Sequence, residues 1–188
     1  MKNFKKILAT LLASALCISM MACTKGDDKK DDDKDDDESS SQQIEKGSAS
    51  EAVVNYYDAL YGGDEDAVLD LVLDEFAIKY FMDLNGYTED EVYTNVGSSL
   101  TTSMAAESHE VTVKSEETPD DDKYSSIVEE LTTEYKYDEA AIEDIKIVTC
   151  DLSVKLSDGN GIALDDHEIV LTKIGGNWYL TGIVWGMN

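Results

Sequence analysis

Hydrophobic positions recur at helical spacing from about residue 48 onward. Ser48-Ala49-Ser50-Glu51 has the form of a capping box, in which a serine and a glutamate three residues later satisfy the first free amide groups of a helix. Apolar residues then follow at intervals of three and four, which places them on one helical face: Val53, Tyr56, Tyr57 and Leu60. The pattern predicts a first helix that ends at Gly62-Gly63.

The same spacing predicts two more helices before the first strand. Asp64 caps the second, which carries Val68, Leu71, Val72 and Phe76 and continues through Tyr80 and Phe81 to Gly86. Thr88-Glu89-Asp90-Glu91 is another capping box, and the third helix has one apolar face: Val92, Val96, Leu100 and Met104.

Alternation replaces the helical period after residue 109. Val111 and Val113 predict a short strand over residues 110–118, and Pro119 and Asp120 then introduce a fourth helix that runs to Tyr135. Three further apolar segments predict strands over residues 145–156, 162–174 and 178–187. We therefore expect an α+β fold, with N-terminal helices packed on one face of a curved antiparallel sheet.

Glycine-rich turns set the faces of the predicted sheet. A two-residue turn at Asn160-Gly161 and another at Gly175-Gly176 are the tight hairpin types that such residues favour. They bring even-numbered residues of the first long strand onto one face with odd-numbered residues of the second. The predicted core face contains Val148, Cys150, Leu152, Val154, Ile169, Leu171, Trp178, Leu180 and Val184.

The charge of the chain excludes nucleic acid as a partner. Its 188 residues include 41 acidic and 15 basic residues, and the formal net charge is −26. All the basic residues are lysines, so the chain lacks the arginine that reads guanine, and its lysines are too few to displace counterions from a polyanion.

The N-terminus carries the most specific signal. Three lysines among the first six residues precede an uncharged run from Ile7 to Ala22, which is typical of a signal peptide and short for a membrane-spanning helix. The run ends in Ser19-Met20-Met21-Ala22-Cys23, which resembles the lipobox of bacterial lipoproteins, although methionine replaces the usual leucine. The resemblance implies cleavage of residues 1–22, acylation of Cys23, and anchoring on the outer face of the bacterial cytoplasmic membrane.

Residues 23–50 are predicted to form a disordered acidic tether. The segment from Asp27 to Ser41 has no apolar side chain, so it cannot offset the entropy cost of ordering. Calcium binding is the alternative, but the glycine at the sixth position of an EF-hand loop is missing, and no metal or cofactor site is expected. Cys150 remains without a cysteine partner in the mature chain and is predicted to be a core residue.

Residues 51–188 are predicted to form one domain that resembles the NTF2-like superfamily, with a cystatin-like fold as the near alternative. The stretches that carry the resemblance run from Glu51 to Asp64 and from Lys173 to Leu180, within the order of helices, strand, helix and meander. The resemblance implies a cone-shaped sheet around the helices, whose interior can be a ligand pocket or an active site. It implies no particular reaction.

Two histidines are the available bases at neutral pH, and His167 is the candidate site residue. The predicted register places it on the core face between Val154 and Val184, with space left by Gly182 and Gly186 beside its imidazole and the Asp165 carboxylate. The alternative is a structural histidine satisfied by Asp165, with the glycines serving sheet curvature. His109 is expected to be a solvated boundary residue.

The opposite face of the predicted sheet is unusually apolar. It would turn outward Tyr179, Ile183 and Trp185, together with Ile147, Thr149, Val170 and Thr181. Such a face predicts either contact with a second copy or another protein, or cover by a helix or the C-terminal segment.

The sequence thus leaves two classes of function. The first is a lipid-anchored surface protein whose non-catalytic domain binds a small ligand or a protein partner. The alternative is an isomerase or dehydratase of the NTF2-like kind, with His167 as base and Asp165 as its orienting group.

Overall fold

The computed structural model describes residues 44–100, 106–156 and 159–187. The predicted signal peptide, the lipidation site Cys23 and the acidic run of the tether lie outside the described residues. Among those described, no helix has both the length and the apolar character needed to cross a membrane.

The two helices predicted from capping boxes are confirmed, although Met104, predicted on the later one, lies outside the described residues. Helix α2 spans Ala49–Gly62 and begins at Ser48, whose hydroxyl accepts a 3.1 Å hydrogen bond from the Glu51 amide. Helix α5 spans Glu89–Leu100, and at its start Glu91 accepts a 2.8 Å bond from the Thr88 amide.

The predicted second helix is wrong as a single element. It is divided into α3, Glu65–Val72, and α4, Glu75–Asn85. Asp74 is the reason, because its carboxylate accepts hydrogen bonds from the amides of Phe76 at 2.8 Å and Ala77 at 2.9 Å and so begins a new helix.

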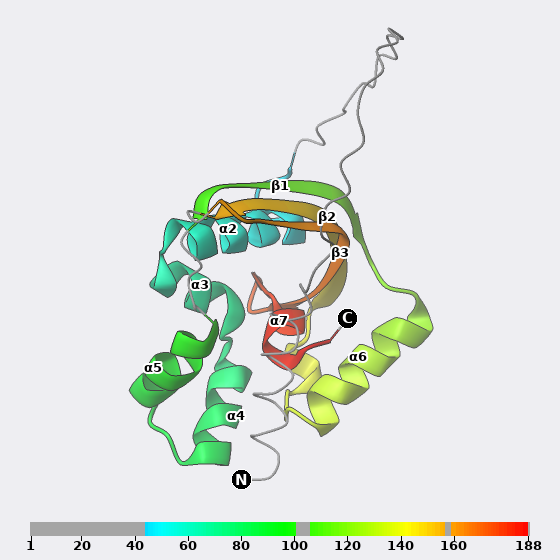
Figure 1. Cartoon of the computed structure of the whole chain (residues 1–188). Helices are drawn as coiled ribbons and strands as arrows, with labels where there is room; N and C mark the ends of the chain where they lie inside the picture. The colour runs from blue at the N-terminus through cyan, green and yellow to red at the C-terminus, as the bar shows by residue number, and fades with distance from the viewer. Residues whose placement is uncertain (1–43, 101–105, 157–158, 188) are drawn as a thin grey trace, which may run out of the picture.

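The α+β class is confirmed by a four-stranded antiparallel sheet in the order β1-β2-β3-β4. The strands span Ala106–Glu117, Asp144–Leu156, Gly161–Ile174 and Asn177–Tyr179, and helix α6, Asp121–Thr133, with a short 3₁₀ turn at Glu139–Ala141, connects β1 to β2. Figure 1 shows the sheet curling over α2, with α4 and α6 at its open end.

The predicted turn at Asn160-Gly161 is wrong. The Leu156 amide donates to the Asn160 carbonyl at 2.8 Å. Asn160 is therefore hydrogen-bonded to the end of β2 and is not a central residue of the turn. The Gly175-Gly176 turn is confirmed, since Ile174 pairs with Asn177 and both glycines have positive φ.

A bulge in β3 changes the register that the turn alone would set. Asp166 adopts φ 52°, and the pairing shifts there between Leu152–Leu164 and Cys150–His167. The Asp151 carboxylate stabilises the bulge, because it accepts a 2.9 Å bond from the Asp166 amide. The predicted even–odd pairing therefore holds beyond the bulge but fails near the turn, where Val154 faces Ile162.

The last predicted strand, residues 178–187, is also wrong beyond Tyr179. Thr181–Trp185 forms the short helix α7, which lies beneath the curled sheet (Figure 1). A helical turn buries Val184 and Trp185 together, whereas adjacent residues of a strand would point to opposite faces.

The domain begins a few residues before the predicted boundary at Glu51. Ala49 and Ser50 are buried in the first turn of α2, and they belong to the fold rather than to the tether.

Candidate ligand-binding site

The predicted pocket around His167 is not assembled. His167 is half-buried opposite Cys150, not between Val154 and Val184, and burial lowers the pKa of its imidazole. Asp165 is exposed on the other side of the bulge, and no hydrogen bond joins it to His167 in the described part of the chain. The proposed base and orienter of an enzyme therefore lack their predicted geometry.

The two glycines of that pocket have structural roles. A Cβ atom at Gly182 would lie 2.9 Å from the Met187 carbonyl oxygen and 3.0 Å from the Val170 amide nitrogen, so this glycine lets α7 approach β3. Gly186 ends α7 with φ 69°, in the left-handed region that favours glycine. Gly182 therefore does not leave the space that the sequence predicted.

The three candidate interface residues do not form one outward face. Trp185 is buried, and Tyr179 and Ile183 are half-buried on different elements, β4 and α7. The C-terminal segment folds against β3 instead, where the Thr181 hydroxyl lies 2.9 Å from that of Thr172. This is the alternative that the sequence left open, a face covered by the chain itself.

An aromatic cluster fills the space between α4, α7 and the segment after α6. Trp185 stacks on Tyr135 with ring centroids 4.0 Å apart and on Phe81 at 5.3 Å. Tyr80 meets the Trp185 ring edge-on at 5.2 Å, and Phe76 stacks on Tyr137 at 5.0 Å. These ring contacts form a closely packed apolar cluster at this end of the domain.

A buried polar chain crosses the cluster. The Tyr137 hydroxyl donates to the Asp74 carboxylate at 2.6 Å and accepts from the Trp185 indole at 3.1 Å. Burial raises the pKa of Asp74, and the hydrogen bonds from Tyr137 and from the Ala77 and Phe76 amides oppose this shift. The burial of this carboxylate was not predicted from the sequence.

A cleft of about 410 Å³ opens beside the aromatic cluster, and we call it the α4 cleft. Phe76, Tyr80 and Leu84 lie one helical turn apart along α4 and form its apolar wall. Leu84 is unusually exposed for a leucine, at 41%. The charged residues that line the cleft are Lys79, Asp83 and Lys136.

The two lysines of the α4 cleft differ from the others of the domain. Ion pairs engage four of the seven lysines after residue 50: Lys114, Lys123, Lys146 and Lys155. Lys173 lies over the Trp178 ring, with its ammonium 5.6 Å from the centroid. In the described ranges, Lys79 and Lys136 form no ion pair, and Lys136 donates only to the Thr133 carbonyl.

A second cleft, of about 580 Å³, lies where the tether enters the domain, and we call it the tether-side cleft. Its walls include Glu51, Asp70, Glu75, Tyr93 and Tyr179, so it combines carboxylates with aromatic rings. Acidic walls are expected here because the domain carries 31 acids and seven lysines, and they give little information about a ligand.

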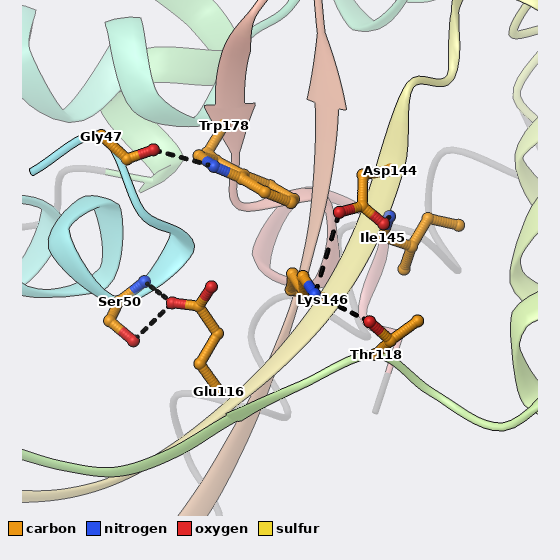
Figure 2. Close-up of polar contacts among 8 residues, drawn as sticks. All are labelled: Gly47, Ser50, Glu116, Thr118, Asp144, Ile145, Lys146 and Trp178. Carbon is orange, nitrogen blue, oxygen red and sulfur yellow. Dashed lines mark hydrogen bonds and ion pairs between the residues drawn. The ribbon is translucent and has the colours of Figure 1, made fainter. Parts of the chain in front are cut away.

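Hydrogen bonds hold Trp178, which lines the tether-side cleft, and the first turn of α2 beside it. The Trp178 indole donates to the Gly47 carbonyl at 3.2 Å, and Glu116 accepts bonds from the Ser50 amide at 2.8 Å and hydroxyl at 2.7 Å (Figure 2). These contacts hold the first residues of the domain against the sheet.

The structure does pair one histidine with an aspartate, but not the predicted pair. His109 Nε2 lies 2.8 Å from Asp58 Oδ1, and the Tyr61 ring lies beside the imidazole at 5.4 Å. The predicted solvated boundary residue is thus half-buried and paired. Cys150 is buried as predicted, and burial raises the pKa of its thiol to about 11, which disfavours the reactive thiolate.

In the described ranges, no group of three or more His, Cys, Asp or Glu side chains is placed to hold a metal ion.

Comparison of the chain with protein-family models, curated proteins and solved structures found no significant match. The resemblance to bacterial lipoproteins and to the NTF2-like superfamily therefore stays a prediction from the residues that carry it.

The apolar wall of the α4 cleft could have been predicted from the sequence. Phe76, Tyr80 and Leu84 follow one another at intervals of four, a second apolar stripe beside the one that the core uses. Lys136 could not be placed beside this stripe from the sequence, because it lies 52 positions after Leu84 and approaches only through the packing of the segment after α6.

Proposed function

We propose that this chain is a lipid-anchored bacterial surface protein whose α+β domain binds a small ligand, without catalysis, in the α4 cleft. The observation that carries the proposal is a concave site with an apolar wall on one rigid helix and a few charged groups at its rim. Small-molecule sites commonly have this composition, and the volume of about 410 Å³ lies within their usual range.

The aromatic cluster supports a preformed site. Tyr80 belongs both to the cleft wall and to the cluster, where its ring meets Trp185 and Tyr135. Because buried rings pack in fixed geometry, this wall keeps its shape without a ligand, which lowers the entropy cost of binding.

The anchor rests on the N-terminal residues. The charged start, the short apolar run and the Ala22-Cys23 junction favour a lipoprotein signal, and the acidic segment that follows would separate the domain from the bilayer. In the native host, wild-type protein should fractionate with membranes and yield a diacylated Cys23 peptide by mass spectrometry. Cys23→Ala should lose both properties, and an unmodified Cys23 peptide from the wild type would contradict the anchor.

Ligand binding can be tested without knowing the ligand. The chain from residue 23 with Cys23→Ser removes the proposed acylation site and keeps every described residue. We expect that a library of neutral, cationic and anionic aromatic or aliphatic fragments will shift the NMR signals of the Leu84 methyl groups and the Tyr80 ring. Leu69, buried on α3, provides control methyl signals that should not move. Fragments that bind elsewhere, with the Leu84 signals unchanged, would refute the α4 cleft as the binding site.

A further inference from the structure

We infer that the α4 cleft selects an amphipathic carboxylate, a molecule with an apolar body and one anionic group. The inference rests on the proposed function and adds the chemical class of the ligand. Its basis is the coincidence of two lysines without carboxylate partners and a partly exposed apolar wall in a strongly acidic domain.

The lysines are unusual because carboxylates are abundant around them. With 31 acids to seven lysines after residue 50, an ammonium group at the surface readily finds an acidic neighbour, as four of the lysines do. Lys79 and Lys136 come from different elements and line the same cleft, yet neither is paired there with a described acid. Two ammonium groups without carboxylate partners at one opening can donate hydrogen bonds to the two oxygens of a carboxylate.

The apolar wall accounts for the rest of the ligand. Leu84 is 41% exposed, and it continues the stripe of Phe76 and Tyr80 along α4. Covering this stripe removes apolar surface from water at about 25 cal/mol per Å², so a hydrocarbon or aryl group gains affinity there. A bare inorganic anion would leave the stripe exposed and would gain only the polar contacts.

Acidic groups near the cleft limit the attraction. Asp83 lines it, one turn after Lys79 on α4. Burial raises the pKa of the Tyr80 phenol, and the nearby Glu134 carboxylate raises it further. The net charge of −26 also repels anions from the whole molecule. A preference for anions at this site would therefore have to come from the two lysines themselves.

The positive charge of the two cleft lysines and the negative charge of the whole chain predict opposite ligand preferences, so a pair of oppositely charged ligands tests the inference. Dodecanoate and dodecyltrimethylammonium carry alkyl chains of nearly the same length and head groups of opposite charge, so calorimetry below their micelle concentrations compares an anionic with a cationic head group. With the chain from residue 23 carrying Cys23→Ser, we expect dodecanoate to bind at least tenfold more tightly. Acetate, which lacks the apolar body, should show no measurable binding.

Variants assign the effect to the cleft. Lys79→Gln and Lys136→Gln should each weaken dodecanoate binding at least fivefold, whereas the control Lys155→Gln, at an exposed ion pair with Glu107, should leave it unchanged. Asp83→Asn removes a repulsive charge and should strengthen binding two- to threefold. Unchanged melting temperatures will show that each variant is folded.

The outcomes separate the ligand class from the proposed function. Equal or tighter binding of the ammonium detergent, or dodecanoate binding that both cleft lysine variants leave intact, would overturn the carboxylate assignment. If library fragments still shift the Leu84 signals in either case, ligand binding in the cleft stands and only its class is wrong. If neither detergent nor fragment reaches the cleft, both proposals fail.

Discussion

The hydroxyl of Tyr137 donates a 2.6 Å hydrogen bond to the carboxylate of Asp74, 63 positions earlier in the chain. Asp74 also begins α4, and the Tyr137 hydroxyl accepts the indole N–H of Trp185 in α7. One buried polar chain thus links the helix that carries the α4 cleft to the C-terminal helix.

Removing the Tyr137 hydroxyl should destabilise the domain. Tyr137→Phe leaves a carboxylate oxygen and an indole N–H without their partner in the core, a loss of about 1–3 kcal/mol in the free energy of unfolding. Urea unfolding followed by tryptophan fluorescence measures it. Tyr124→Phe is the control, because the half-buried Tyr124 makes no hydrogen bond through its hydroxyl within the described residues, and it should change stability little.

A double-mutant cycle with Asp74→Asn tests whether the two residues act together. The combined loss for Tyr137→Phe and Asp74→Asn should be smaller than the sum of the single losses, because either change already disrupts the same bond. Strictly additive losses would show that the buried bond contributes no coupling.

The pKa of Asp74 predicts a pH dependence of its own. Burial raises the folded-state pKa above the ordinary value of 3.8, so the folded state holds the proton more strongly than the unfolded state. The contribution of this group to stability is therefore fully present below the ordinary pKa and is lost as pH rises through the folded-state pKa. The rest of the acidic chain also titrates, so the quantity to measure is the difference between wild type and Asp74→Asn.

Urea unfolding of both proteins from about pH 4 to about pH 8 gives that difference. Relative to the Asn variant, wild type should be most stable at the acidic end and should lose stability as pH increases. A difference that grows with pH would mean that the hydrogen bonds to the carboxylate outweigh its desolvation.

Local signals predicted most of the helices and the sheet. The capping boxes at Ser48 and Thr88 and the Gly175-Gly176 turn act through neighbouring residues, so their effect can be read from a short stretch of sequence. The β3 bulge could not be predicted in this way. It depends on Asp151 and Asp166 meeting Lys114 of a third strand, at 2.7 and 2.9 Å from its ammonium, and such contacts exist only after the sheet has formed.

The predicted placement of His167 was wrong because it followed from one assumed turn. The actual turn puts Ile162 opposite Val154, so His167 lies further along the strand, opposite Cys150. The division between α3 and α4, by contrast, could have been predicted. Asp74 is a residue type that commonly begins a helix, and here its carboxylate accepts hydrogen bonds from the Phe76 and Ala77 amides. The sequence did not reveal that this same carboxylate is buried, since its partner Tyr137 is distant in the chain.

Gly182 should tolerate no larger residue. In Gly182→Ala the new methyl group would meet backbone atoms of Met187 and Val170, which cannot move aside as a flexible side chain could. We expect a loss of about 1–3 kcal/mol in the free energy of unfolding, from urea titration. The matched control is Gly62→Ala at the end of α2, where the methyl group meets no atom within 4 Å and should stabilise the helix by up to about 1 kcal/mol. Similar effects of the two substitutions would contradict the close approach of α7 to β3.

The N-terminal boundary of the folded domain gives the last prediction. A chain that begins at Glu51 lacks the Ser48 cap, the buried Ala49, the Ser50 bonds to Glu116 and the Gly47 carbonyl that Trp178 binds (Figure 2). We expect it to be less stable than a chain that begins at Ile44 by about 2–4 kcal/mol, since a cap and a buried hydrogen bond each contribute about 1 kcal/mol.

Extending the chain back to residue 23 is the control for that comparison. The added acidic run has no apolar side chain between Asp27 and Ser41, so it should change the free energy of unfolding by less than about 0.5 kcal/mol. Urea unfolding of the three chains under the same conditions decides between the boundaries. If the chain from Glu51 were as stable as the chain from Ile44, the contacts of Gly47 and Ser50 would contribute nothing to folding. A large loss between the chains from residues 23 and 44 would instead make the acidic run part of the folded domain.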